Sequence, residues 1–440
     1  MSPVRRASVH TLGCRLNQSE SLLLRDRLEK EGYRLVPFGE EADLGIINTC
    51  TVTNLADAKC RNVIRSFVRK NPRAFTAVVG CYSQMGHKAV AEIPGVDLII
   101  GNQDKLSVLD YVGFGKNETP VIVRDRIDKT DFSIHFAGEL PFNKRANLKV
   151  QDGCDFMCSF CIIPFARGRS RAREFGNLLD EARSLAARGV REIVLTGVNI
   201  GTYAYEGRGI LEVVEALNSV TGIDRIRISS IEPTTIPEEL FGMMRDPDHA
   251  LLPFLHIPLQ SGCDRVLGLM KRKYSFYEYL DFIHRANDAV PDLCIGTDIM
   301  VGFPGESGEE FDETCRVFLE NPFAYCHVFS FSEREGTPAE RMEGSVSVPE
   351  RTRRSAFLRR LSASRRREYY EKFLGRTLRV LFEDPKPGHW TGYTDNYVRV
   401  VVDAETVPPE TGDLTNRTGM VRLEKVSADF VEGRILKGEG

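Results

Sequence analysis

The sequence contains no long apolar run. No stretch of its 440 residues approaches the ~20 consecutive apolar residues of a membrane-spanning helix, and the N-terminal MSPVRRASVHTLGC lacks an apolar signal region. An excess of one charge is also missing: 59 basic residues face 62 acidic ones, so composition alone does not indicate nucleic-acid binding. No short-period internal repeat is visible. We therefore expect a cytoplasmic protein with no membrane partner and, from its length, about three domains.

What the chain does contain is cysteine. Eleven cysteines, an odd number, in a long chain without a secretory signal indicate reduced thiols rather than a disulfide framework. Ligation of a metal ion or a cluster then becomes the favoured reason for several of them.

Three of these cysteines lie in the stretch KVQDGCDFMCSFCIIPFARGRSRAR. Cys154, Cys158 and Cys161 have the spacing C-x3-C-x2-C. Three thiolates ligate three irons of a four-iron cubane and leave the fourth iron open, whereas four thiolates suit electron transfer. An open iron binds a substrate-like ligand, as the open position of a catalytic zinc does. A structural zinc site is the alternative, but such sites usually show paired C-x2-C spacings, and the nearest upstream histidine, His135, is loosely placed.

The same spacing, with Phe160 before the third cysteine, resembles the signature of the radical S-adenosylmethionine (SAM) superfamily. The resemblance implies that the amine and carboxylate of SAM chelate the open iron, which places the sulfonium where an electron cleaves it. Cys154, Cys158 and Cys161 are then the cluster ligands and the catalytic residues.

Three strand–helix units are predicted in the first hundred residues. The apolar segments and the helical patterns that follow them are 8–12 with 17–31, 44–48 with 55–70, and 76–80 with 84–93. This alternation predicts a doubly wound parallel sheet, whose loops at the carboxyl ends of the strands meet at one edge. Each loop holds one cysteine: Cys14, Cys50 and Cys81. We expect them to converge as a second three-cysteine cluster site, although each alone could be a small apolar residue that ends a strand.

The loops TLGCRLNQSES, INTCTVTN and VVGCYSQ resemble the N-terminal domain of the methylthiotransferases, a radical SAM family that carries two [4Fe–4S] clusters. With the central motif, the resemblance covers nearly the whole chain. Subgroups of this family insert sulfur and a methyl group into tRNA adenosines or into an aspartate of a ribosomal protein. The Arg-Leu-Asn after TLGC and the later IIPFARGRSRAR are most similar to the subgroup that acts on threonylcarbamoyladenosine in tRNA. Ala172 departs from that subgroup, where serine is expected.

The patterns divide this α/β chain into four segments. Residues 1–105 form the N-terminal methylthiotransferase domain, and residues 106–145 form a linker of mixed polarity with one short strand at 121–123. Residues 146–374 carry six further β/α units and predict a partial (β/α)6 barrel of the radical SAM type. The strands of this barrel are expected at 148–151, 192–196, 225–229, 253–257, 294–300 and 325–330. Residues 375–440 alternate with period two and predict a small antiparallel β-barrel that resembles the TRAM domain, an RNA-binding module.

Four polar or glycine residues follow the barrel strands at the carboxyl face, where active-site loops lie. Gly197 and Asn199 occur in TGVN, Glu232 in SIEP and Gln260 in LQSG. The resemblance implies that Gly197 and Asn199 meet the amino group of SAM and that Gln260 meets its ribose side. Each of these residues alone could instead be a turn residue or a helix cap.

Arginines and aromatic residues indicate contacts with RNA. The arginines beside the cluster loop, which would grip the anticodon-loop backbone or a substrate carboxylate, are Arg167, Arg169, Arg171 and Arg173. Residues 351–379 hold eleven basic residues against two acidic ones on a predicted helix. Such an excess suits phosphate neutralisation, although most charge runs are solvated helix faces. Trp390, Tyr393 and Tyr397 would stack on unpaired bases or fill the small barrel.

The family resemblance implies a complete reaction. We expect conversion of N6-threonylcarbamoyladenosine at tRNA position 37, next to the anticodon, into 2-methylthio-N6-threonylcarbamoyladenosine. The reaction would use two [4Fe–4S] clusters, SAM and a low-potential electron donor such as flavodoxin or ferredoxin, with the tRNA anticodon loop and no DNA as partner. The alternatives are methylthiolation of a ribosomal protein aspartate or of isopentenyladenosine in tRNA. A non-catalytic iron–sulfur RNA-binding scaffold is the alternative from a different class, and SAM cleavage under reductant would distinguish it.

Overall fold

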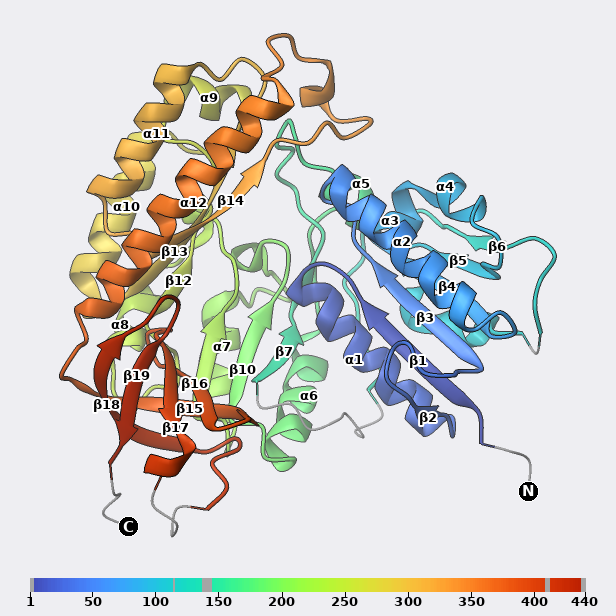
Figure 1. Cartoon of the computed structure of the whole chain (residues 1–440), viewed down its shortest axis with the longest axis horizontal. Coiled ribbons are helices and arrows are strands. Elements are labelled where there is room, and N and C mark those ends of the chain that lie inside the picture. Colours follow the sequence, from blue (N-terminus) through green and yellow to red (C-terminus); the bar gives the residue numbers. More distant parts are fainter. Residues whose placement is uncertain (1–3, 114, 137–144, 408–411, 437–440) are drawn as a thin grey trace.

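The computed structural model describes residues 4–113, 115–136, 145–407 and 412–436 (Figure 1). It contains an N-terminal parallel sheet, a central partial barrel and a small C-terminal barrel, as the sequence predicts. Within these described ranges, no helix has the length and apolarity needed to cross a membrane. Pro408 and Pro409, a pair typical of a turn between strands, and residues 137–144 of the predicted linker lie outside the described residues.

The N-terminal sheet has six parallel strands in the order β2-β1-β3-β4-β5-β6. The strands are β1 (Arg6–Thr11), β2 (Arg34–Leu35), β3 (Leu44–Thr49), β4 (Phe75–Gly80), β5 (Leu98–Ile100) and β6 (Val121–Val123). The helices are α1 (Arg15–Lys30), α2 (Asn54–Lys70), α3 (Cys81–Met85), α4 (His87–Ala91) and the 3-10 helix η1 (Lys105–Tyr111). Alternate strand residues pack on α1 and η1 on one face and on α2 and α4 on the other, so the sheet is doubly wound.

Two details of this domain differ from the prediction. The strand β6 pairs with β5 through Leu98↔Val121, so the sheet continues beyond residue 105 into the predicted linker. The three apolar residues of 121–123 do not indicate by themselves which strand they pair with. The predicted helix 84–93 is two short helices that meet at Gly86, where an added Cβ would lie 2.3 Å from the Tyr82 ring.

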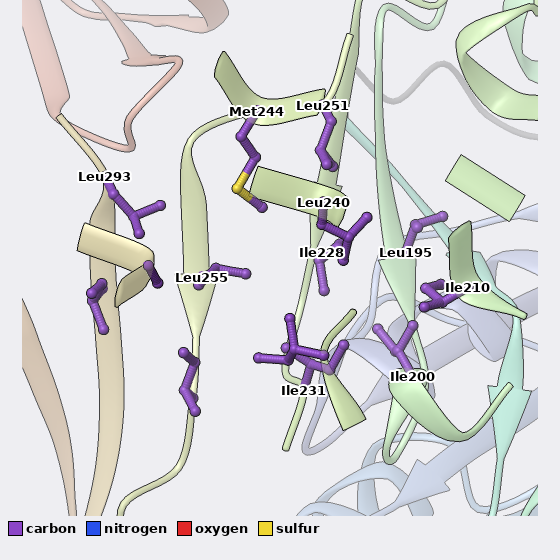
Figure 2. Packing of buried hydrophobic residues seen from close by; sticks show 14 of the residues in the cluster. Leu195, Ile200, Ile210, Ile228, Ile231, Leu240, Met244, Leu251, Leu255 and Leu293 are labelled. Atoms are coloured by element: carbon purple, nitrogen blue, oxygen red, sulfur yellow. The ribbon is translucent and has the colours of Figure 1, made fainter. Parts of the chain in front are cut away.

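The central barrel is built from two three-stranded parallel sheets. One contains β7 (Arg145–Lys149), β10 (Glu192–Thr196) and β11 (Arg225–Ile228), and the other contains β12 (Phe254–His256), β13 (Cys294–Val301) and β14 (Tyr325–Ser330). The bridge Ile226↔Leu251 leads from one sheet to the other. The outer helices are α6 (Phe175–Ala187), α7 (Ile210–Asn218), α8 (Glu239–Arg245), α9 (Asp264–Leu269), α10 (Phe276–Ala289) and α11 (Gly308–Glu320). Leu195, Ile228 and Leu255 are fully buried in the core between strands and helices, as Figure 2 shows.

The predicted basic helix is α12 (Val348–Glu371), which packs along β14 and α11 (Figure 1). Leu358 is fully buried, and the Ser362 hydroxyl accepts from the Cys326 N–H at 2.9 Å and donates to the Cys326 carbonyl at 2.8 Å. Arg351 and Arg354 are also buried, and they pair with Glu333 and Glu306. The inner face of this charge run therefore stabilises the central barrel rather than offering cations to RNA.

The C-terminal barrel is closed in the order β15-β16-β17-β19-β18. Its strands are β15 (Thr377–Lys386), β16 (His389–Thr394), β17 (Arg399–Asp403), β18 (Thr418–Val426) and β19 (Val431–Ile435). The predicted small antiparallel barrel is confirmed, with one exception: β17 and β19 run parallel. The sequence did not reveal β16, whose aromatic residues were expected either to stack on bases or to fill the barrel. It also did not reveal β19, which has a glycine at its centre.

Candidate active site

A cavity of about 900 Å³ lies where the three parts of the chain meet. Its lining includes Cys14 and Cys50 from the N-terminal domain, Cys161 from the central cluster loop, and Tyr397 from the C-terminal barrel. Residues just beyond β1, β3, β10, β11 and β12 contribute, so the cavity lies at the carboxyl ends of strands in all three parallel sheets. No single sheet forms this cavity alone.

Two glycines bring the N-terminal cysteine loops together. Gly13 has φ +99°, and a Cβ there would lie 2.6 Å from Cβ and 2.8 Å from Sγ of Cys50. Gly80 has φ +98°, and a Cβ there would lie 2.5 Å from the side-chain oxygen of Asn48 and 2.7 Å from the Thr49 carbonyl. Both positions favour glycine by conformation and by space. They hold Cys14 and Cys81, the residues that directly follow these glycines, against the end of β3.

Two of the thiols of this first set, Cys50 and Cys81, are buried, and Cys14 is exposed. Burial raises the pKa of Cys50 to about 12, and the neighbouring sulfurs of Cys81 and Cys14 add to the shift. Asn102 donates its side-chain N–H to the Cys81 sulfur at 3.5 Å. Cys60 is buried on α2 and donates to the Cys50 carbonyl, so it has a packing role. Three thiols gathered in this way need a cationic centre to be bound as thiolates.

The central set, Cys154, Cys158 and Cys161, lies in the loop between β8 (Gln151–Asp152) and α5 (Ile163–Arg167). Burial raises the pKa of Cys154 to about 11 and that of Cys161 to about 12. Burial also raises the pKa of Cys158, whose sulfur accepts an N–H from Arg272 at 3.2 Å. A guanidinium beside a sulfur stabilises the thiolate form that a cluster requires.

A compact set of ligand atoms also lies in the cavity lining. Among the described residues, His256, Asp298 and His327 place three ligand atoms within 4.8 Å of one another. In a four-iron cubane each cysteine sulfur binds a separate iron, so each set of three cysteines suits a cluster with one open iron.

The four predicted SAM-binding residues divide into two pairs. Gly197 and Gln260 line the cavity. Asn199 and Glu232 are not part of its lining: the Asn199 side-chain oxygen accepts from Thr235 at 3.1 Å, and Glu232 pairs with Arg272. The side-chain nitrogen of Asn199 is buried without a partner among the described residues. All four roles stay predictions.

Gln151 is a residue that the sequence reasoning missed. Its side-chain oxygen accepts the backbone N–H groups of Val198 at 2.8 Å and Asn199 at 3.0 Å. Its side-chain nitrogen donates to the Gly153 carbonyl at 2.7 Å. Gln151 therefore fixes the loop after β10 against the start of the cluster loop. In the sequence, its position directly before Asp152, Gly153 and Cys154 could have indicated that it supports the cluster loop.

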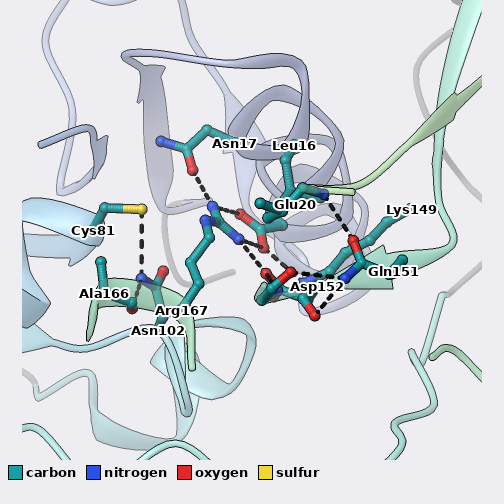
Figure 3. Close-up of polar contacts among 12 residues, drawn as sticks. Leu16, Asn17, Glu20, Cys81, Asn102, Lys149, Gln151, Asp152, Ala166 and Arg167 are labelled. Atoms are coloured by element: carbon teal, nitrogen blue, oxygen red, sulfur yellow. Dashed lines mark hydrogen bonds and ion pairs between the residues drawn. The ribbon is translucent and has the colours of Figure 1, made fainter. Parts of the chain in front are cut away.

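A buried network of charges joins the N-terminal domain to the cluster loop (Figure 3). Glu20 of α1 accepts from Lys149 at 2.8 Å and from Arg167 at 3.1 Å, and it also pairs with Lys105. Asp152 accepts from the same Lys149 at 2.6 Å and the same Arg167 at 3.0 Å. Burial alone raises the pKa of Glu20, but the charges of Arg167, Lys105 and Lys149 outweigh burial and hold that pKa well below its ordinary value.

The arginines of the ARGRSRAR segment are mostly committed to the protein itself. Arg167 lines the cavity but is 1 % exposed and held by Glu20. Arg173 is fully buried and pairs with Glu181, and Arg171 lies 3.7 Å from Asp152. The donors of Arg173 are used inside the fold, and the contacts of these arginines with RNA or substrate stay predictions.

Arg169 is the exposed member of that segment. Its guanidinium lies 3.8 Å from Asp155, a pair in which both side chains are half exposed. The direct phosphate contact expected for this residue stays a prediction.

The aromatic residues of the C-terminal barrel also separate by role. Trp390 packs against the barrel core. Tyr393 and Tyr397 line the cavity, with ring centroids 4.9 Å apart in a stacked arrangement. Arg227 lies over the Tyr397 ring at 4.8 Å. Two of the three predicted stacking residues therefore face the space shared with the cysteines.

Sequence profiles of two protein families match the chain. The radical SAM superfamily matches residues 148–318, and a family described as uncharacterized protein family UPF0004 matches residues 6–101. Among solved structures, the radical SAM methyltransferase TsrM from Kitasatospora setae superimposes with a TM-score of 0.55 at 16% identity, covering 77% of each chain. This likeness confirms the radical SAM fold.

Curated relatives extend over almost the whole chain. Threonylcarbamoyladenosine tRNA methylthiotransferase MtaB of Bacillus subtilis is 36% identical over 97% of this chain and 96% of that protein. Its counterpart from Aquifex aeolicus is 34% identical over 86% of this chain and 92% of that protein. The tRNA-2-methylthio-N(6)-dimethylallyladenosine synthase of Agrobacterium fabrum is 31% identical over 94% of each.

The fold and the cysteine loop define a radical SAM protein. The chain belongs to the methylthiotransferase family of that superfamily. It is an enzyme, and its cofactors are [4Fe–4S] clusters and SAM.

Proposed function

We propose that this enzyme methylthiolates N6-threonylcarbamoyladenosine at position 37 of tRNA. The observation that carries the proposal is the shared cavity, whose lining joins Cys14 and Cys50, Cys161 and the stacked pair Tyr393 and Tyr397. A base turned out of the anticodon loop needs aromatic faces to stack on. The relatives named for the threonylcarbamoyl substrate support this choice at up to 36% identity, against 31% for the dimethylallyl enzyme of Agrobacterium fabrum.

The two cysteine sets have separate places in the proposed reaction. Cys154, Cys158 and Cys161 would hold the cluster that binds SAM, and Cys14, Cys50 and Cys81 would hold the other. When bound, these groups supply the electron that cleaves SAM and the sulfur that enters the product. Gly197 and Gln260 lie on the cavity wall beside this chemistry, and the missing Cβ of Gly197 leaves space for Gln151, whose side-chain oxygen would lie 2.8 Å from such an atom.

The chain itself positions the reactants and limits water. Gln151 holds the loop after β10, and Arg272 holds the Cys158 sulfur through an N–H donor. Phe160 and Phe329, from the cluster loop and β14, add apolar surface to the cavity, which excludes water from reactive species. The proposed partners are the tRNA anticodon loop and a low-potential donor such as flavodoxin or ferredoxin. The proposed location is the cytoplasm, where tRNA is found.

A nucleoside assay tests the function. Anaerobically reconstituted protein with SAM and reductant is given three tRNAs: one with threonylcarbamoyladenosine, one with isopentenyladenosine and one with unmodified adenosine at position 37. We expect 2-methylthio product from the first tRNA and at least tenfold less from the others. Equal turnover of the first and third tRNAs would overturn the substrate assignment, and preference for the second would transfer it to the dimethylallyl group. Analysis of tRNA from a deletion strain gives the same comparison in cells.

A further inference from the structure

The charged residues of the cavity reveal where an anion would bind. Five arginines line it: Arg15, Arg167, Arg227, Arg366 and Arg399. Three of them have carboxylate partners, namely Glu20 for Arg167, Glu192 for Arg227 and Asp429 for Arg399. Among the described residues, Arg15 and Arg366 have none. These two guanidinium groups are therefore the cationic groups of the lining that are not neutralised by the protein.

The two carboxylates of the lining do not compensate for them. Asp298 accepts from His256 at 2.9 Å and lies 3.4 Å from His327. Asp429 pairs with Arg399 at 2.6 Å. The side of the cavity near Arg15 and Arg366 thus carries net positive charge.

Arg15 reaches the cavity from the N-terminal domain. It is the first residue of α1, directly after Cys14. Its guanidinium donates to the Tyr397 hydroxyl at 3.1 Å, across the boundary between the N-terminal domain and the C-terminal barrel. This contact uses one of five N–H donors and leaves the others for a ligand.

Arg366 reaches the same region from α12. Its guanidinium carbon lies 5.1 Å from the centre of the Tyr325 ring. Stacking on a ring face leaves the N–H donors in the guanidinium plane free to bind an acceptor. Burial raises the pKa of Tyr325 well above its ordinary value, and the charges of Arg366 and Arg15 both oppose that shift. The tyrosines that these two arginines contact, Tyr325 for Arg366 and Tyr397 for Arg15, both line the cavity.

We propose that Arg15 and Arg366 form the subsite that binds the carboxylate of the threonylcarbamoyl group, an inference that rests on the proposed function. Two guanidinium groups from different parts of the chain match one carboxylate, which accepts several N–H donors. A dimethylallyl group offers no such acceptor and would leave both cations without a partner, at a cost in binding. The pair therefore acts as a specificity determinant.

The experiment removes one charge from each side. Arg15→Gln and Arg366→Gln are prepared in the full-length, cluster-loaded enzyme. Each is assayed on tRNA bearing threonylcarbamoyladenosine and on the same tRNA with that carboxylate converted to the carboxamide. We expect each variant to lower kcat/KM on the carboxylate tRNA by about tenfold to a hundredfold, mainly through KM, since a hydrogen bond to a charged group is lost. On the carboxamide tRNA, the variants should equal the wild-type enzyme.

The control is Arg367→Gln, the exposed neighbour of Arg366, which pairs with Glu371 on the helix surface and does not line the cavity. It should leave both rates unchanged. Iron content is measured for every variant because Arg15 adjoins Cys14. If the Arg15 variant loses iron, the Arg366 variant alone tests the subsite, since Arg366 lies on α12 away from the cluster cysteines in sequence. If a variant loses kcat/KM equally on both tRNAs, or if it prefers the carboxylate tRNA as strongly as the wild-type enzyme does, the subsite is overturned while the proposed function stays intact. A wild-type enzyme inactive on the carboxylate tRNA would instead overturn the proposed function and this inference with it.

Discussion

At the scale of single residues, the cluster sites depend on glycines as much as on cysteines. Gly13 and Gly80 both adopt φ values near +98°, and each directly precedes a cysteine of the N-terminal set. Sequence reading identified the cysteines by their place after strands. It could not show that their glycine neighbours must lie in contact with the end of β3.

Replacing Gly80 with alanine tests this role. The new Cβ would meet backbone and side chain at 2.5–2.7 Å, and the φ of +98° adds strain, so we expect a loss of about 1–3 kcal/mol of stability. Iron bound per chain should also fall toward half, because Cys81 shifts. Thermal unfolding and iron analysis measure these effects.

Gly32→Ala is the matched control. Its φ is +81°, but nothing lies within 4 Å of the added Cβ. The substitution should therefore cost some stability through strain and leave the iron content unchanged. Equal iron loss in both variants would contradict the contact argument.

At the scale of elements, helices α1 and α12 contribute buried charged residues around the site that the sequence did not indicate. The charge run on α12 suggested an RNA-binding face, yet Arg351 and Arg354 are buried in ion pairs with the barrel. A count of charges along a helix cannot tell which face packs against β14. Helix α1 was predicted from its apolar stripe, but its buried Glu20 was not singled out.

Glu20→Gln should weaken the attachment of α1 to the cluster loop. Removing the carboxylate leaves Lys105, Lys149 and Arg167 buried with less compensation, which costs about 3–5 kcal/mol for a buried pair. We expect a lower unfolding temperature and faster proteolysis near the boundary of the N-terminal domain. Glu41→Gln, which breaks an exposed pair with Arg6, is the control and should change little.

The pH dependence of stability provides a second measurement on the same variant. The pKa of Glu20 is held below its unfolded value, so its stabilisation is fully present above that unfolded value, about 4.3, and is lost as pH falls toward the folded pKa. The wild-type unfolding temperature should therefore drop steeply below about pH 4, and the variant should drop less. Parallel pH profiles would show that Glu20 is not ionised in the folded protein.

At the scale of the whole molecule, the cavity makes three folding units interdependent. Its lining comes from the N-terminal sheet, the central barrel and the C-terminal barrel, and Arg15 bonds to Tyr397 across 382 positions of sequence. Cys14 and Cys50 from the N-terminal domain and Cys161 from the central cluster loop line this one cavity. This arrangement allows their contributions to be separated by mutation.

Alanine at Cys154, Cys158 and Cys161 should halve the iron of the reconstituted enzyme from about eight to about four atoms per chain, since each set implies a four-iron cluster. Alanine at Cys14, Cys50 and Cys81 should halve it equally. The second variant should retain reductive cleavage of SAM and lose methylthio product, whereas the first should lose both. Iron analysis and chromatography of the SAM products measure this. Unchanged iron in the first variant would remove the central assignment.

The sequence by itself determined the local features of this protein. The period of apolar residues predicted the strands β10 and β14 to the residue, and the cysteine spacing predicted the central site, because both signals are local in the chain. Position after a strand predicted the convergence of Cys14 and Cys50, because parallel strands end at a common edge.

Only the tertiary structure decided which arginines have a carboxylate partner within the protein and which remain able to bind a ligand. Arg354 and Arg366 lie on the same helix, yet Arg354 meets Glu306 from a distant segment and Arg366 stacks on the Tyr325 ring. The placement of β6 at the sheet edge and the parallel pairing of β17 with β19 also depend on distant partners. A charge or a short strand acquires its role from what packs against it, and that contact is set by the fold rather than by neighbours in the chain.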